Sequence, residues 1–130
     1  MKHLVFVYGS LLRGLPNHRL LTRARLVGAG SVRGLELYDY APGSFPAACR
    51  APRTSYSSSS VAGELYEVTS EELERLDRLE GHPGFYRRVR AHVLVGSDTV
   101  RAWVYVIRRR ELVRRRRIVS GSWRAHIGGV

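Results

Sequence analysis

Short apolar runs separated by turn residues recur along most of the chain, a pattern typical of a protein built mainly of strands. Residues 4–8 are apolar or aromatic throughout and end at Gly9, which predicts a buried strand that leads into a turn. The other strands that the pattern predicts cover residues 26–40, as a pair around Gly34, residues 45–49, residues 61–68, and residues 87–95 and 99–107, as a hairpin across Gly96-Ser97-Asp98.

One helix has clear start and stop signals. Thr69 and Glu72 match the T-x-x-E capping box, in which the two side chains satisfy free amides at the start of a helix. Gly81, with Pro83 shortly after it, supplies a stop signal. We therefore expect a helix that ends near Glu80.

Two segments follow neither pattern. Residues 18–26 fit at most one short helical turn. Residues 41–60 are rich in proline and serine, and so long a connection inside a domain is typical of a lid or binding loop. Apart from the strand at 45–49, we expect a mobile serine-rich tip there.

Length and composition favour one ordinary globular domain over residues 1–130, since the chain shows no repeat and no linker. Cys49 is the only cysteine, which fits a reducing compartment and, for the thiol itself, a packed core position. The N-terminal apolar run is shorter than a signal-peptide core, and no stretch approaches transmembrane length. We expect a cytoplasmic protein without a membrane partner.

The net charge of +11 comes almost entirely from arginine, because Lys2 is the only lysine among 22 basic residues. The densest block is Arg108 to Arg117. Such runs can bind nucleic acid, but no aromatic residues interleave with these arginines and no nucleic-acid-binding motif is present. The block fits a solvated surface better, and we expect no specific nucleic-acid partner.

Glu80 is the acidic residue whose place in the pattern suggests chemistry. It follows Leu73 and Leu76 at helical spacing, so it continues the apolar stripe of the predicted helix. Burial and the negative end of the helix dipole would both raise the pKa of this carboxyl toward neutrality, which suits a general acid–base. A glutamate at the core rim that reaches solvent fits the spacing equally well. Glu71, Glu72, Glu74 and Asp77 are interpreted as helix-start and surface charges.

The turn Tyr8-Gly9-Ser10-Leu11 is the second candidate. Consecutive backbone amides at the end of a buried strand can form an anion site for a carboxylate or an oxyanion, and Gly9 has no side chain to block a ligand. A plain strand-ending turn fits the same residues. The five histidines are scattered without metal-ligand spacing, and no catalytic triad is evident, so we expect no metal and no cofactor.

Taken in order along residues 4–123, a set of short motifs resembles the gamma-glutamylcyclotransferase family, in particular its gamma-glutamylamine cyclotransferase and AIG2-like branch. The motifs are Val5-Phe6-Val7-Tyr8-Gly9-Ser10-Leu11, Arg13-Gly14, Asn17-His18, Gly63-Glu64-Leu65-Tyr66-Glu67-Val68, Leu76-Asp77-Arg78-Leu79-Glu80-Gly81, Tyr86-Arg87-Arg88, Ala102-Trp103-Val104-Tyr105 and Ser120-Gly121-Ser122-Trp123. Ser122 stands where the family usually has aspartate.

The resemblance implies an α+β fold, a small mixed β-barrel with flanking short helices. It implies a transferase- or lyase-type enzyme in which the α-amine of a γ-glutamyl substrate attacks its own γ-carbonyl, yielding 5-oxoproline and a free amine. Glu80 would be the general acid–base, and the amides of the turn from Tyr8 to Leu11 would hold the substrate. Tyr86 and Tyr105 would be pocket residues, although core packing suits both equally.

Two other functions fit the same residues. One is removal of a γ-glutamyl protecting group from a biosynthetic intermediate, with the same mechanism. The other is a non-catalytic, basic binding module on the same fold, against which the presence of both Glu80 and the Tyr8 turn argues. The sequence indicates neither the leaving amine nor an oligomeric state.

Overall fold

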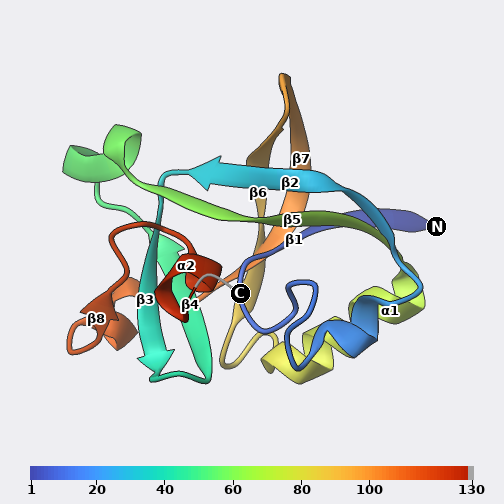
Figure 1. Cartoon of the computed structure of the whole chain (residues 1–130), viewed down its shortest axis with the longest axis horizontal. Coiled ribbons are helices and arrows are strands. Elements are labelled where there is room, and N and C mark those ends of the chain that lie inside the picture. The colour runs from blue at the N-terminus through green and yellow to red at the C-terminus, as the bar shows by residue number, and fades with distance from the viewer. Residues whose placement is uncertain (129–130) are drawn as a thin grey trace.

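The computed structural model describes residues 1–128, so positions 129 and 130 of the expected domain lie outside the described part. Five strands close into a barrel in the order β1-β5-β2-β6-β7 (Figure 1). They are β1 (Lys2–Val7), β2 (Arg25–Arg33), β5 (Ser60–Thr69), β6 (Arg87–Val95) and β7 (Asp98–Val106). Neighbours are antiparallel except for the parallel pair of β1 and β7, which closes the barrel.

A second sheet stands beside the barrel, in the order β4-β3-β8. Its strands are β3 (Leu35–Ala41), β4 (Phe45–Arg50) and the short β8 (Arg116–Arg117), all paired antiparallel. The predicted strand pair around Gly34 is thus divided, since β2 belongs to the barrel and β3 to the second sheet. The helices are α1 (Ser70–Glu80), α2 (Trp123–His126) and the 3-10 helices η1 (His18–Leu21), η2 (Arg53–Ser58) and η3 (Arg109–Leu112).

This architecture confirms the expected mixed barrel with short flanking helices. The core takes buried residues from every barrel strand, among them Phe6, Val32, Leu65, Val93 and Val104. The predicted hairpin of residues 87–107 is confirmed as β6 and β7.

Helix α1 begins and ends where its local signals predicted. The Thr69 side chain accepts a hydrogen bond from the amide of Glu72 at 3.1 Å, and the Glu72 carboxylate accepts one from the amide of Thr69 at 2.7 Å. Gly81 ends the helix with φ of 68°, the left-handed conformation that glycine adopts most easily. The helix packs against β1, β5 and η1, so its last turn lies near the end of β1.

Ser122 is the start of another helix. Its hydroxyl accepts a hydrogen bond from the amide of Ala125 at 3.1 Å, which caps α2. Serine and aspartate are both good N-caps, so Ser122 can fill the structural place of the aspartate that the resemblance led us to expect.

The serine-rich tip is a correction to the sequence-based expectation. Residues 53–58 form η2 rather than a free loop, and Ser59 is buried. The Ser55 hydroxyl donates to the carboxylate of Glu36 at 3.3 Å. The tip therefore packs on the second sheet, which the polar composition of the segment did not reveal.

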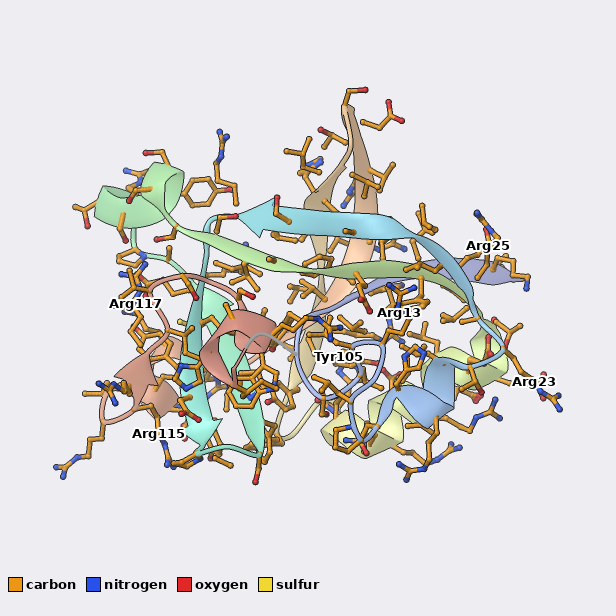
Figure 2. All side chains as sticks on the ribbon, viewed as in Figure 1. Arg13, Arg23, Arg25, Tyr105, Arg115 and Arg117 are labelled. Carbon is orange, nitrogen blue, oxygen red and sulfur yellow. The ribbon has the colours of Figure 1, made fainter. Side chains whose placement is uncertain are left out.

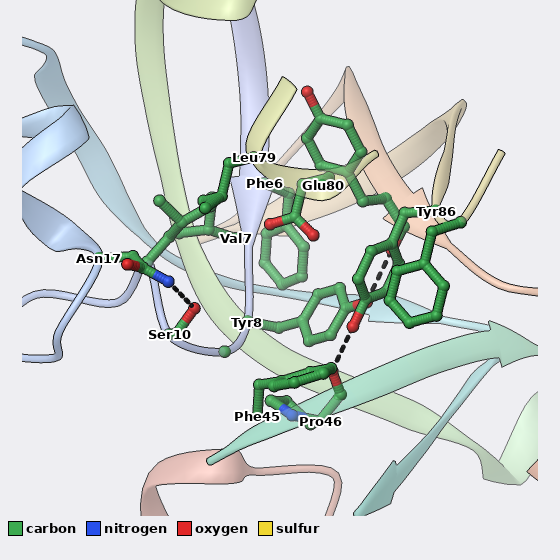
Figure 3. Close-up of a pocket in the computed structure, with 14 residues that line it drawn as sticks. Phe6, Val7, Tyr8, Ser10, Asn17, Phe45, Pro46, Leu79, Glu80 and Tyr86 are labelled. Atoms are coloured by element: carbon green, nitrogen blue, oxygen red, sulfur yellow. Dashed lines mark hydrogen bonds between the residues drawn. The ribbon is translucent and has the colours of Figure 1, made fainter. Parts of the chain in front are cut away.

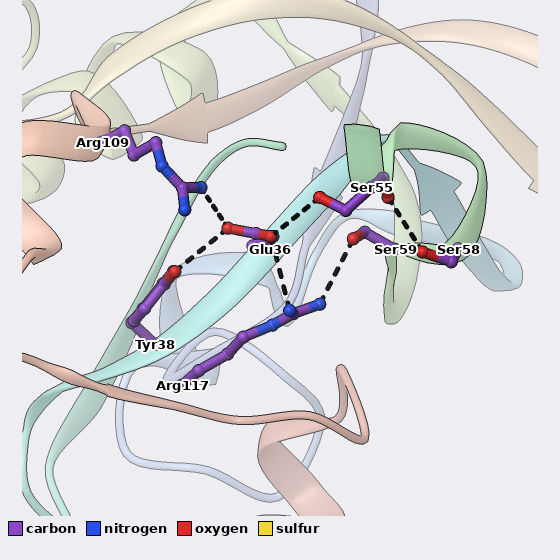
Figure 4. A network of polar contacts seen from close by, with 7 residues as sticks. All are labelled: Glu36, Tyr38, Ser55, Ser58, Ser59, Arg109 and Arg117. Atoms are coloured by element: carbon purple, nitrogen blue, oxygen red, sulfur yellow. Dashed lines mark hydrogen bonds and ion pairs between the residues drawn. The ribbon is translucent and has the colours of Figure 1, made fainter. Parts of the chain in front are cut away.

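The basic block is also only partly the solvated surface that was expected. Glu36 is 3% exposed, and Arg109 and Arg117 both pair with its carboxylate, the second at 3.4 Å (Figure 4). Burial alone would raise the pKa of Glu36, but hydrogen bonds from Arg109 and Tyr38 outweigh it and lower that pKa. Arg115 lies over the ring of Tyr40 at 4.3 Å. Part of the block therefore neutralises a buried acid and holds η3 and β8 against strand β3.

Four of the labelled arginines of Figure 2 lie at opposite ends of the molecule, with Arg13 between them. Arg23 and Arg25 are at the end that carries α1, and Arg115 and Arg117 are at the end that carries β8. Among residues 1–128, no helix is long and apolar enough to cross a membrane.

Candidate active site

A cavity of about 200 Å³ opens between the turn after β1, the start of β4 and the end of α1 (Figure 3). All seven residues singled out from the sequence line it: Tyr8, Gly9, Ser10, Leu11, Glu80, Tyr86 and Tyr105. The remaining lining residues are Phe6, Val7, Asn17, Phe45, Pro46, Leu79 and Phe85. Residues almost one hundred positions apart thus meet at one site.

Glu80 is the last residue of α1, and its carboxylate points into the space framed by Phe6, Tyr8 and Tyr86 (Figure 3). Leu76, one turn earlier, is fully buried, which confirms the predicted apolar stripe. Within residues 1–128 no group donates a hydrogen bond to this carboxylate. Burial raises the pKa of Glu80 to about 7, so both protonation states are populated near neutrality and the group can accept and return a proton.

The turn after β1 lines the same cavity. A hydrogen bond from the amide of Leu12 to the carbonyl of Gly9, at 3.0 Å, closes the turn. Ser10 and Leu11 occupy its two central positions, whose amides the turn itself does not use. The side chain of Asn17 donates a hydrogen bond to the hydroxyl of Ser10 at 2.9 Å. The main-chain amide of Asn17 donates another to the Ser10 carbonyl at 2.9 Å. The amides are therefore held in place and can meet an anion.

Gly9 has a packing role that the sequence did not indicate. A Cβ atom at this position would lie 2.8 Å from Cδ and 2.9 Å from Cγ of Pro46. We expected the absence of a side chain at Gly9 to leave room for a ligand. In the structure, this absence allows the turn to pack closely against β4.

Three tyrosine hydroxyls near the cavity have their protons directed elsewhere. Tyr8 donates to the carbonyl of Tyr105 at 2.7 Å, and Tyr86 donates to the carbonyl of Pro46 at 2.7 Å. Tyr105 donates to the carboxylate of Asp77 at 2.6 Å. Burial raises the pKa of all three phenols, so they stay neutral. The two interpretations, packing and pocket lining, therefore both hold for Tyr86 and Tyr105.

Asp77 corrects another expectation, because it is not a free surface charge. It is partly buried in α1 and also accepts a hydrogen bond from Nε of Arg88 at 2.8 Å. Burial alone would raise the pKa of Asp77, but the hydrogen bonds from Arg88 and Tyr105 outweigh it and lower that pKa.

An aromatic wall at the mouth is the part of the site that sequence reasoning missed. The ring of Tyr40 lies 5.6 Å from that of Phe45 and 5.3 Å from that of Phe85, centroid to centroid. Leu79 and Phe85 are each 41% exposed, so the mouth is apolar. The turn chemistry around these residues could be recognised in the sequence, but no local pattern shows which segments face one another.

Other titratable residues form no comparable site. Among the described residues, no three His, Cys, Asp or Glu side chains come together to hold a metal ion. Cys49 is fully buried, and burial raises the pKa of its thiol to about 11, in agreement with its expected role in core packing.

Comparison with known proteins agrees with this fold. Residues 5–125 match the family model described as gamma-glutamyl cyclotransferase, AIG2-like. The gamma-glutamylcyclotransferase family protein YtfP of Escherichia coli is 34% identical over 119 residues, which cover 92% of this chain and 94% of that protein. The gamma-glutamylaminecyclotransferase of Rattus norvegicus is 33% identical over 115 residues, covering 78% of this chain and 75% of the rat protein.

A solved structure gives the same result at the level of the fold. The crystal structure of an AIG2-like protein from Mus musculus superposes with a TM-score of 0.70 at 31% identity, covering 81% of this chain and 76% of the mouse chain. Sequence, fold and family model thus agree over nearly the whole described chain, which belongs to the gamma-glutamyl cyclotransferase, AIG2-like family of enzymes.

Proposed function

We propose that this protein cyclises a γ-glutamyl amine or γ-glutamyl amino acid to 5-oxoproline, with release of the free amine. The observation that supports this most directly is the Glu80 carboxylate, which shares one cavity with the Ser10 and Leu11 amides and has a pKa of about 7. A carboxyl with this pKa can accept the proton of the substrate's α-amine and return it near neutral pH.

In the proposed reaction, Glu80 takes a proton from the substrate's α-amine as its nitrogen attacks the γ-carbonyl carbon. The new carbon–nitrogen bond closes the ring, and the γ-carbonyl oxygen carries the negative charge until the bond to the leaving nitrogen breaks. Protonated Glu80 then delivers its proton to that nitrogen. Atoms and charge balance without water or a further reactant.

The α-carboxylate of the substrate would bind the amides of Ser10 and Leu11, at the side of the cavity opposite the leaving group. Holding amine and carbonyl together supplies much of the rate of an intramolecular reaction. A cavity of about 200 Å³ is smaller than a drug-sized site and suits the glutamyl part of the substrate, while the leaving amine would reach the apolar mouth at Leu79 and Phe85.

The test is a panel of γ-glutamyl amines and γ-glutamyl amino acids, incubated with purified protein and a chelator and assayed for 5-oxoproline. We expect release from at least one compound. The matched N-acetyl compounds, in which the amine is blocked, and the α-glutamyl isomers should yield none. Binding without turnover across the panel would favour a non-catalytic module, and activity lost to the chelator and restored by zinc would contradict the mechanism.

A further inference from the structure

A chain of hydrogen bonds through Tyr105 links the two halves of the cavity. The Tyr8 hydroxyl donates to the main-chain carbonyl of Tyr105 at 2.7 Å, and the Tyr105 hydroxyl donates to Asp77 at 2.6 Å. Tyr8 directly precedes Gly9, the first residue of the turn that contains the Ser10 and Leu11 amides. Asp77 lies one helical turn before Glu80, so the two are neighbours on the surface of α1. One residue on β7 is thus tied to both halves, through its main-chain carbonyl on one side and its hydroxyl on the other.

The Asp77 end of this chain is built to remain an acceptor. Arg88 and Tyr105 are directly opposite partners in the β6–β7 pair, and both donate to the same oxygen of Asp77. The arginine side chain is 21% exposed and that of the aspartate 18%, so solvent has little access to the pair. An ionised carboxylate held in this way accepts the hydrogen bond from the tyrosine hydroxyl and cannot donate one in return.

Main-chain hydrogen bonds order the turn after α1. The amide of His82 donates to the carbonyl of Asp77 at 2.9 Å, and the amide of Tyr86 donates to the carbonyl of Glu80 at 3.1 Å. The carbonyl of Glu80 is therefore held by a residue after the turn, and the segment that follows α1 is held to the helix at Asp77.

Asp77 does not line the cavity, and the hydroxyl proton of Tyr105 is committed to it, so neither carboxylate nor hydroxyl proton is available to a substrate. We propose that Asp77 and the Tyr105 hydroxyl are positioning residues, which hold Glu80 at a fixed separation from the Gly9–Leu11 turn. The proposal rests on the proposed cyclisation. That reaction needs the amine about 3–3.5 Å from the carbonyl, and an error near 1 Å can cost about 10²-fold in rate.

The central variant is Tyr105→Phe, which removes only the hydroxyl and keeps both the ring and the carbonyl that accepts from Tyr8. We expect kcat to fall by about 10–10²-fold with KM nearly unchanged, because the substrate carboxylate still meets the turn. Asp77→Ala should have the same effect, and the double variant should be no worse than either single one, as for residues that act through one contact. Asp77→Asn, which keeps an oxygen acceptor, should recover part of kcat.

The chain offers a matched control in Tyr38→Phe. The Tyr38 hydroxyl is also buried and donates to a carboxylate, that of Glu36 at 3.0 Å, which is likewise paired with arginine (Figure 4). This group lies outside the cavity. We expect Tyr38→Phe to lower the melting temperature about as much as Tyr105→Phe does, and to leave kcat and KM at wild-type values.

Three results would overturn the positioning role while 5-oxoproline formation by the wild type still stands. They are full kcat in Tyr105→Phe, a raised KM with unchanged kcat, which would make the hydroxyl a substrate-binding group, or an equal loss of kcat in Tyr38→Phe. A wild-type protein that forms no 5-oxoproline from any compound of the panel contradicts the proposed function and this proposal with it.

Discussion

Glu80 lies in a cavity wall where no hydrogen bond from the described residues, 1–128, offsets the loss of water around its carboxylate. The nearest tyrosines cannot supply one, since the hydroxyls of Tyr8 and Tyr86 donate to main-chain carbonyls. A donor at that point would stabilise the ionised form and weaken the base. The surrounding side chains thus keep the glutamate able to change protonation state near neutrality.

At the scale of this residue, Glu80→Gln is the sharpest variant. Glutamine keeps the size of the side chain but cannot accept the amine proton, so turnover should fall by about 10²–10⁴-fold with little change in KM. The control is Glu71→Gln, an exposed position at the start of the same helix, which should be nearly silent. Near-normal turnover of Glu80→Gln would show that the proton passes through another group.

The raised pKa of Glu80 also predicts two dependences on pH. Because the base must be ionised, kcat/KM should rise as pH increases through about 7. In the folded protein the carboxyl ionises only near that pH, whereas in the unfolded chain it ionises near its ordinary value of 4.5. Between these values the folded state binds more protons, so the free energy of unfolding falls as pH rises.

Urea unfolding of Glu80→Gln measures the second dependence. The variant should be more stable than the wild type above pH 7, and the difference should disappear below about pH 4.5, where the glutamate is neutral in both states. A difference that is independent of pH would mean that the carboxylate is not buried.

At the scale of elements, the site depends on the fit between the turn after β1 and strand β4. Gly9→Ala would place a methyl group 2.8 Å from Cδ of Pro46 and should displace the Ser10 and Leu11 amides. Because a hydrogen bond to a charged group contributes about 1.5–3 kcal/mol, we expect KM to rise by about tenfold or more, with a smaller change in kcat. Gly84→Ala, whose Cβ would meet only the carbonyl oxygen of Gly81 at 3.7 Å, should keep the wild-type KM.

At the scale of the whole molecule, the buried Glu36 joins the second sheet to two segments distant in sequence. Replacing both Arg109 and Arg117 by glutamine would leave this carboxylate buried without a cation, which costs about 3–5 kcal/mol. The loss of folding stability should be largest at pH 7. It should shrink near pH 4, because burial without arginines raises the pKa of Glu36 and protonation then relieves the charge.

Chemical denaturation at both pH values is the measurement. Arg110→Gln combined with Arg114→Gln removes the same charge from exposed positions of the same block and should cost less than about 1 kcal/mol. If the two double variants lost equal stability, net charge rather than the buried pair would be responsible.

Local patterns in the sequence determined much of the architecture. The capping box at Thr69, the stop at Gly81 and the stripe of Leu73 and Leu76 involve residues within one or a few helical turns. Such contacts follow from helix geometry alone, so α1 and the position of Glu80 at its end could be predicted. The strands could be predicted for the same reason, since alternation also lies within a few residues, and the ordered motifs indicated the family.

Only the tertiary structure decided which side chains meet across the fold. Asp77 looked like a surface charge because its partners lie 11 and 28 positions further along the chain. The arginines of the basic block looked solvated because Glu36 lies 73 positions before Arg109. The aromatic wall at the cavity mouth has the same origin. Hydrogen bonds, ion pairs and burial between distant segments depend on how strands pair and pack. Such contacts produce no local pattern in the sequence near either partner, so they could not be predicted from it.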